Sequence, residues 1–106
     1  MASMDERRDA AEKKFAHDEE LRFKAMARRN KLLGLWAAEK LGKSGADAEA
    51  YARSVIMADF EESGEEDVFR KIRKDFDAAN VAETDAEIRA KMEELLAKAK
   101  LDVLAD

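Results

Sequence analysis

The chain has 106 residues, of which 46% are hydrophobic, 42% charged and 7% aromatic, and its net charge is −5. This length lies in the ordinary range of single domains, so we expect one core beneath a heavily charged surface. The absence of cysteine excludes disulfides and thiolate zinc sites and suits a reducing cytoplasm. Charge appears within residues 1–8 and no apolar run is long enough to span a membrane, so secretion and membrane insertion are disfavoured. With no proline and only four glycines, an all-β fold with many tight turns is disfavoured, and helices are expected.

The N-terminal stretch has a helix-favouring composition up to about Leu41, interrupted only by Gly34. Its first part, residues 1–20, carries few large apolar side chains, those of Met1, Met4 and Phe15. These are too few to offset the entropy lost in docking against a core. We therefore expect residues 1–20 to form a protruding or disordered arm that becomes helical when a partner covers it.

Residues 21–41 are apolar enough to pack as the first helix of a bundle. The side chains expected on its inward side are those of Phe23, Met26, Leu33, Ala37 and Leu41, with Leu32 and Trp36 adjoining. The segment 42–45 is expected to be a turn, because it contains two glycines and a serine. A second helix is expected from about Asp47 to Phe60, with an apolar stripe of Ala48, Tyr51, Ala52, Val55, Ile56 and Phe60.

Two further helices are predicted to begin at capping boxes, in which a hydroxyl residue is followed three positions later by glutamate. These pairs are Ser63 with Glu66 and Thr84 with Glu87. The expected inward residues are Val68, Phe69, Ile72 and Phe76 in the first, and Ile88, Met92, Leu95, Leu96, Ala99 and Val103 in the second. The last helix, of roughly 20 residues or 30 Å, matches the length of residues 21–41. The expected fold class is all-α: a four-helix bundle of residues 21–106 with an N-terminal arm of residues 1–20.

No motif of a common enzyme class is found, since the chain lacks a phosphate-binding loop, a glycine-rich nucleotide fingerprint and a nucleophile elbow. We therefore expect no catalytic activity. A di-iron site of the Glu-x-x-His type is excluded because Lys14 stands three positions before the single histidine, His17. His17 is expected to be a solvated helix residue, with a pH-responsive switch as the alternative. The carboxylates of residues 61–67 are too irregular for a calcium loop and are expected to be a solvated helix start, so no metal site is predicted.

Residues 21–31 carry five basic and no acidic side chains, between acidic segments of the chain. The basic residues are Arg22, Lys24, Arg28, Arg29 and Lys31. Together with the nearby Trp36 they form a candidate site for the phosphates of a nucleotide. The alternative, which we favour, is a solvated helix face. Nucleic acid is not an expected partner, because the positive charge is confined to this short run.

Two segments, residues 15–42 (FAHDEELRFKAMARRNKLLGLWAAEKLG) and residues 59–71 (DFEESGEEDVFRK), resemble the zeta subunit of alphaproteobacterial F-type ATP synthase. The similarity extends from about Asp5 to Leu104. It implies a four-helix bundle that docks on the catalytic head and inhibits ATP hydrolysis through its N-terminal segment. That segment would insert between alpha and beta subunits near the gamma stalk. The resemblance also implies regulatory binding of ADP or ATP, with no tightly bound cofactor.

The arm of this chain matches the inhibitory region of that family in position. Its side chains suited to partner contacts are those of Met4, Arg7, Arg8, Lys13, Lys14 and Phe15. The resemblance implies a cytoplasmic location, peripheral to the inner membrane through the ATP synthase, and we expect a monomer when the protein is free. Two alternatives use the same bundle: a general helical adaptor of another cytoplasmic complex, and a nucleotide-sensing module without inhibitory activity.

Overall fold

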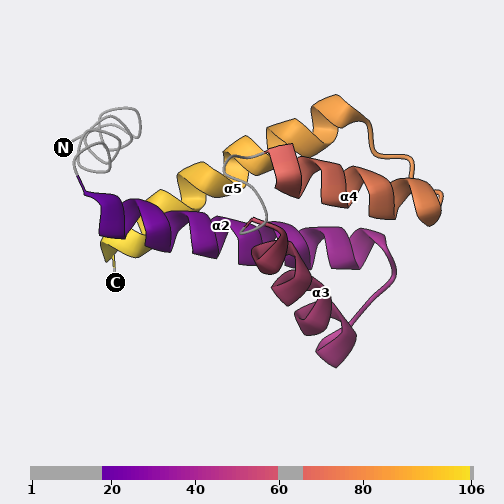
Figure 1. The fold of residues 1–106 in the computed structure, drawn as a ribbon, viewed down its shortest axis with the longest axis horizontal. Helices are drawn as coiled ribbons and strands as arrows, with labels where there is room; N and C mark the ends of the chain where they lie inside the picture. Colours follow the sequence, from indigo (N-terminus) through magenta and orange to yellow (C-terminus); the bar gives the residue numbers. More distant parts are fainter. Residues whose placement is uncertain (1–17, 60–65, 106) are drawn as a thin grey trace.

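The computed structural model describes residues 18–59 and 66–105. These residues form four helices and no strand: α2 (Glu19–Lys40), α3 (Gly45–Ala58), α4 (Glu66–Ala78) and α5 (Asp85–Ala105). The all-α fold class with four helices is therefore confirmed (Figure 1). Residues 1–17 of the predicted arm, Phe60 of the predicted second helix and Ser63 of the first capping box lie outside the described residues.

Helix α2 begins at Glu19, two residues before the predicted boundary of the bundle. The reason is local, because the side chain of Asp18 accepts a hydrogen bond from the backbone N–H of Leu21 at 3.0 Å and so caps the helix. Glu19 and Glu20 in the first turn add favourable charge at the positive end of the helix dipole. Asp18 therefore belongs structurally to the bundle.

Helices α2 and α4 end in the same way, with a residue in the left-handed conformation. Gly42 has φ of 79°, and the N–H of Lys43 donates to the carbonyl of Ala38 at 2.9 Å, which satisfies an otherwise unpaired carbonyl of the last turn. After α4, Asn80 takes the left-handed role with φ of 57°, and the N–H of Val81 reaches back into the last turn at 2.9 Å. The predicted turn after residue 41 is thus confirmed.

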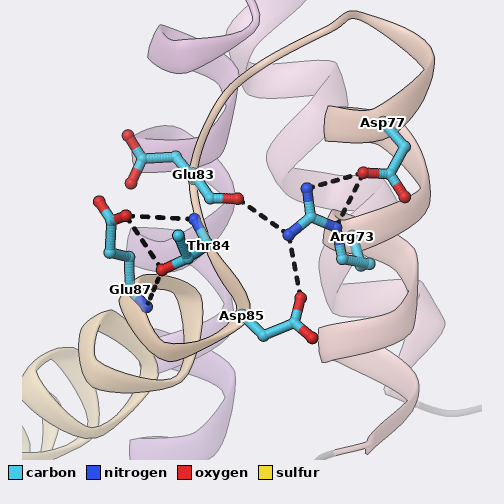
Figure 2. A network of polar contacts seen from close by, with 6 residues as sticks. All are labelled: Arg73, Asp77, Glu83, Thr84, Asp85 and Glu87. Atoms are coloured by element: carbon cyan, nitrogen blue, oxygen red, sulfur yellow. Dashed lines mark hydrogen bonds and ion pairs between the residues drawn. The ribbon is translucent and has the colours of Figure 1, made fainter.

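Helix α5 begins at the capping box predicted from the sequence. The N–H of Glu87 donates to the hydroxyl of Thr84 at 3.1 Å, and the N–H of Thr84 donates to the Glu87 carboxylate at 3.2 Å (Figure 2). Arg73 of α4 reaches across to the same loop, where its guanidinium donates to the carboxylate of Asp85 at 3.0 Å and to the carbonyl of Glu83 at 2.9 Å. The loop between α4 and α5 is therefore tied to both helices.

The two long helices, α2 and α5, lie side by side and antiparallel, so the start of α2 and the end of α5 meet at one end of the bundle (Figure 1). At that end Ala25 and Val103 are buried together, with Leu21, Leu101 and Leu104 packed around them. Helices α3 and α4 pack at the other end of the pair. The larger core cluster lies there, formed by Leu33, Ala37, Ala38, Tyr51, Val55, Val68, Phe69, Ile72, Phe76, Ile88 and Met92.

The crossing of α2 and α3 depends on Gly34. A Cβ atom built on Gly34 would lie 2.6 Å from the Cα of Ala52 and 3.1 Å from its Cβ. Real Cβ atoms do not approach backbone atoms so closely, so only glycine permits this separation of the two helices. The glycine that interrupts the N-terminal helical pattern is thus a packing residue.

The predicted inward faces are confirmed in α4, where Val68, Phe69, Ile72 and Phe76 are all buried. In α5, Ile88, Met92, Ala99 and Val103 are buried, whereas Leu95 and Leu96 are only half-buried. In α3, Tyr51, Ala52 and Val55 are buried, as expected, and Ala48 and Ile56 are half-buried.

The predicted inward face of α2 is wrong at its N-terminal half. Phe23 is 66% exposed, and the inward positions there are occupied by Ala25, Arg29 and Asn30. Phe23 precedes Gly34 by about three helical turns and so lies on nearly the same side, the side that α3 covers at Gly34. Near Phe23, the C-terminal end of α3 contributes Ile56 and Asp59 to the lining of a groove that Phe23 also borders. At this end α2 is buried mainly against α5, and its buried stripe shifts accordingly.

Candidate functional site

The predicted partner contacts of the arm fall in residues 1–17. Met4, Arg7, Arg8, Lys13, Lys14, Phe15 and also His17 therefore lie outside the described residues. Their roles remain predictions. The arm joins the described structure at Asp18, at the end of the bundle where the last turn of α5 also lies (Figure 1).

The basic run of α2 does not form one solvated face. Arg22, Lys24 and Lys31 are exposed and Arg28 is half-buried, but Arg29 is 0% exposed. The Nε of Arg29 donates a hydrogen bond to the side-chain oxygen of Asn30, which is also buried, at 2.7 Å. The prediction that all five bases share a solvated or phosphate-binding face is therefore wrong for Arg29. Its position points into the bundle, so its guanidinium is not presented to a soluble ligand.

Three of the remaining bases gather at one groove of about 550 Å³ between α2, α3 and α5. Its walls include Lys24, Arg28 and Lys31, and its floor is apolar, with Leu21, Ala27, Ile56 and Val103. Part of the positive charge is compensated, because Arg28 lies 3.9 Å from Asp102 and Lys24 lies 3.4 Å from Glu20. The groove has the chemistry of an anion site with an apolar side, which suits a phosphate ester attached to a flat or apolar group.

Trp36 does not belong to that groove. Its ring packs against Phe76, with centroids 5.7 Å apart, and Lys91 lies 5.9 Å from the ring centre. Trp36 borders a different hollow that also holds Lys40, Lys91 and the carboxylates of Glu83, Glu87 and Glu94. Because both lysines are already paired with carboxylates, at 3.3 Å for Lys40 and 2.5 Å for Lys91, this hollow is a weaker anion site. The predicted grouping of Trp36 with the bases of residues 22–31 is therefore not formed.

A second groove, of about 360 Å³, was not anticipated from the sequence. It lies between α2 and the C-terminal end of α3, and its apolar walls are Phe23, Met26, Ala27 and Ile56. Arg22, Asn30, Glu19 and Asp59 supply its polar rim. The sequence contains one sign of this groove, namely Phe23, an aromatic residue within a basic run. The apolar periodicity assigned Phe23 to the core instead.

Several ionisable groups with shifted pKa values hold helices together. Burial, and then the 2.8 Å hydrogen bond that its hydroxyl donates to Asp75, raise the pKa of Tyr51 above its usual value. Hydrogen bonds from Arg89, at 3.0 and 3.1 Å, lower the pKa of Glu66 and link α4 to α5. The guanidinium of Arg89 also lies 4.0 Å from the ring centre of Phe69. These contacts are structural.

Two absences apply to the part of the chain that the structure describes. In residues 18–59 and 66–105, no group of three or more His, Cys, Asp or Glu side chains is arranged to hold a metal ion. In the same described ranges, no helix combines the length and apolar character that a membrane crossing requires.

Comparison with known proteins identifies the family. A structure solved by solution NMR is 55% identical to this chain with a TM-score of 0.71, and the match covers 80% of this chain and 96% of the other. No functionally curated protein matches the chain. The family model described as ATPase inhibitor subunit zeta matches residues 1–102, in agreement with the resemblance of residues 15–42 and 59–71. The chain therefore belongs to the family of ATPase inhibitor subunit zeta.

Proposed function

We propose that this protein inhibits ATP hydrolysis by binding the catalytic head of F-type ATP synthase, with its N-terminal arm as the effector. One observation carries the proposal: the family match begins at residue 1, whereas the buried apolar side chains of the described part run only from Ala25 to Val103. The arm thus belongs to the pattern shared with the inhibitor family, and the described residues of the bundle form a core among themselves.

The inhibition has a simple physical basis. An arm wedged between alpha and beta subunits, beside gamma, stabilises one conformation of an enzyme that must cycle through several. Ordering the arm costs a few kcal/mol, so apolar anchors are needed, and Phe15 and Met4 are the large apolar side chains near the basic residues of the arm. No chemistry by this chain is required. The protein would act in the cytoplasm, at the membrane-bound synthase, and would be a monomer when free.

Deletion of residues 2–17 tests this division of roles. The deletion retains Asp18, whose carboxylate caps α2, so the fold is expected to survive. The full-length protein should slow ATP hydrolysis by the cognate catalytic head, and the truncated protein should not, although its thermal unfolding midpoint stays nearly unchanged. Equal inhibition by the two proteins would refute the role of the arm. Co-purification of alpha, beta and gamma subunits with the tagged protein separates this function from that of an adaptor of another complex.

A second candidate function is regulatory binding of ADP or ATP. It is favoured by the groove that brings Lys24, Arg28 and Lys31 together over an apolar floor. The Lys24→Ala, Lys31→Ala double variant should lose the amide chemical-shift changes that ADP induces in the wild type, because exposed phosphate-binding lysines would be removed.

A matched pair of lysines controls for that experiment. The Lys40→Ala, Lys91→Ala variant removes two bases from the hollow beside Trp36 and should retain the ADP-induced shifts. The opposite result would place the nucleotide beside Trp36. Shifts that persist in both variants, or fail to weaken with added salt, would exclude a phosphate contact at either place.

A further inference from the structure

The junction between the arm and α2 is fixed by one side chain. At Asp18 the backbone is extended, with φ of −127° and ψ of 99°, and the carboxylate accepts the 3.0 Å hydrogen bond from the N–H of Leu21. The carbonyl of Asp18 accepts the first helical hydrogen bond, from the N–H of Arg22 at 3.1 Å. These are the features of an N-cap, so the helical path of the backbone starts only after Asp18.

No helix breaker lies in the sequence at this junction. The chain contains no proline, and its first glycine is Gly34. Residues 10–16 (AAEKKFA), just before the junction, are strong helix formers except for Phe15. The start of α2 is therefore set by the cap of Asp18 and not by the conformational preferences of the residues that precede it.

We propose that Asp18 is a positioning residue for the arm and acts as a releasable helix stop. In the free protein its cap fixes the start of α2, and in the complex with the catalytic head α2 continues through position 18 into the arm. The inference rests on the proposed function, because the catalytic head is the partner that holds the arm. Release exchanges one hydrogen bond for another, since the N–H of Leu21 leaves the carboxylate of Asp18 for the carbonyl of residue 17, as in a continuous helix.

The magnitudes of two opposing effects favour continuation of α2 over a separate helix in the arm. A separate helix must form its own first turn, which lowers its equilibrium constant by a factor on the order of 1,000. Extension of α2 avoids that step, because its first turn already exists. It loses the cap of Asp18, worth about fivefold, and the favourable position of Glu19 and Glu20 at the helix start, worth at most about fivefold each. Even together, these losses are smaller than the nucleation factor.

The register of the sequence also fits one continuous helix. Met4, Phe15 and Met26 follow one another at intervals of eleven residues, close to three helical turns, so an extended α2 places them along one side. The two apolar anchors expected in the arm would then form a single line of contact, in a direction set by α2. An extended backbone at Asp18 would turn the arm out of that line.

The full-length Asp18→Ala variant tests the proposal. It removes the cap and lets the helix continue through position 18, so the bound conformation is more populated in the free protein. The half-inhibitory concentration for ATP hydrolysis by the cognate catalytic head should therefore fall about fivefold. In the free protein, the Cα chemical shifts of residues 14–18 should move toward helical values. Asp18→Asn keeps a capping side chain and should behave like the wild type in both measurements.

Thr84→Ala is the matched control. It removes a cap of similar strength from α5, whose first turn lies at the end of the bundle opposite the arm (Figure 1). Both variants should lower the unfolding midpoint by similar amounts, but Thr84→Ala should leave the half-inhibitory concentration and the shifts of residues 14–18 unchanged. An effect of lowered stability alone would appear in both variants and would weaken inhibition.

Other results overturn the proposal. Weaker inhibition by Asp18→Ala than by the wild type would show that the cap is kept in the complex and directs the arm away from α2. An unchanged half-inhibitory concentration, or shifts of residues 14–18 that do not move, would show that Asp18 does not limit the extension of α2. Stronger inhibition by Thr84→Ala as well would assign the effect to loosening of the bundle. If the wild type does not inhibit the catalytic head, the proposed function fails and the inference fails with it.

Discussion

Replacing Gly34 with alanine tests the close crossing of α2 and α3 most directly. In an open helix this change stabilises by about 1 kcal/mol, because alanine favours the helix more than glycine does. Here the new Cβ would lie 2.6 Å from the Cα of Ala52, and a backbone atom cannot rotate away. Overpacking a core costs about 1–3 kcal/mol, and a clash with backbone places this one at the upper end. The expected net effect of Gly34→Ala is therefore a decrease of about 2 kcal/mol in the free energy of unfolding.

Urea unfolding followed by far-UV circular dichroism measures this loss. The midpoint should fall at an unchanged slope, and the thermal midpoint should fall by roughly 10 °C for a domain of this size. Ala27→Gly, at an exposed position of the same helix, measures the helix-propensity term alone and should destabilise by about 1 kcal/mol. If Gly34→Ala were as stable as the wild type or more stable, the two helices would not cross as closely as described.

Four further changes have defined outcomes. Ile72→Ala should destabilise by about 2–5 kcal/mol in chemical denaturation, because the side chain is fully buried, and a loss below about 0.5 kcal/mol would show that the site is not core. Thr84→Ala should cost about 1 kcal/mol through loss of the cap to Glu87, whereas Thr84→Ser keeps the hydroxyl and should be nearly neutral by the same assay. Because the pKa of Tyr51 is raised, its hydroxyl keeps its proton above pH 10 in the folded state, whereas the unfolded chain loses that proton. The contribution of Tyr51 to the free energy of unfolding is therefore fully present below about pH 10 and falls as the pH rises further. Tyr51→Phe should remove that part of the decline, and identical pH profiles for the two proteins would contradict the assignment. Phe15→Ala should weaken inhibition of ATP hydrolysis by roughly 1–3 kcal/mol of binding if the ring fills a pocket, and an unchanged half-inhibitory concentration would exclude it as an anchor.

Much of the fold follows from interactions between residues close in the sequence. The capping box at Thr84 and the left-handed glycine at position 42 involve partners within one or two helical turns, so their spacing alone predicts where helices begin and end. The same holds for the apolar face of α4, from Val68 to Phe76, because a helix with one strong stripe has only one way to bury it.

The candidate site was predicted less well, because it depends on how far neighbouring helices extend. The five bases from Arg22 to Lys31 are consecutive charges in the sequence, but the structure buries Arg29 and leaves three others at one groove. Trp36, only five residues after Lys31, lies against Phe76 and faces another hollow. Proximity along a helix does not give proximity on its surface.

The sequence by itself determined that this chain is helical, where its main helices lie, and which family it resembles, since these depend on composition, short-range spacing and shared residues. Only the tertiary structure decided that Phe23 is exposed, that Arg29 is buried and that Gly34 is a contact between helices. The physical reason is that periodicity assigns a side chain to a face of its own helix, whereas burial requires a second helix opposite that face. Helix α3 lies opposite Gly34, whereas nearer Phe23 it contributes Ile56 and Asp59, from its C-terminal end, to the lining of one groove.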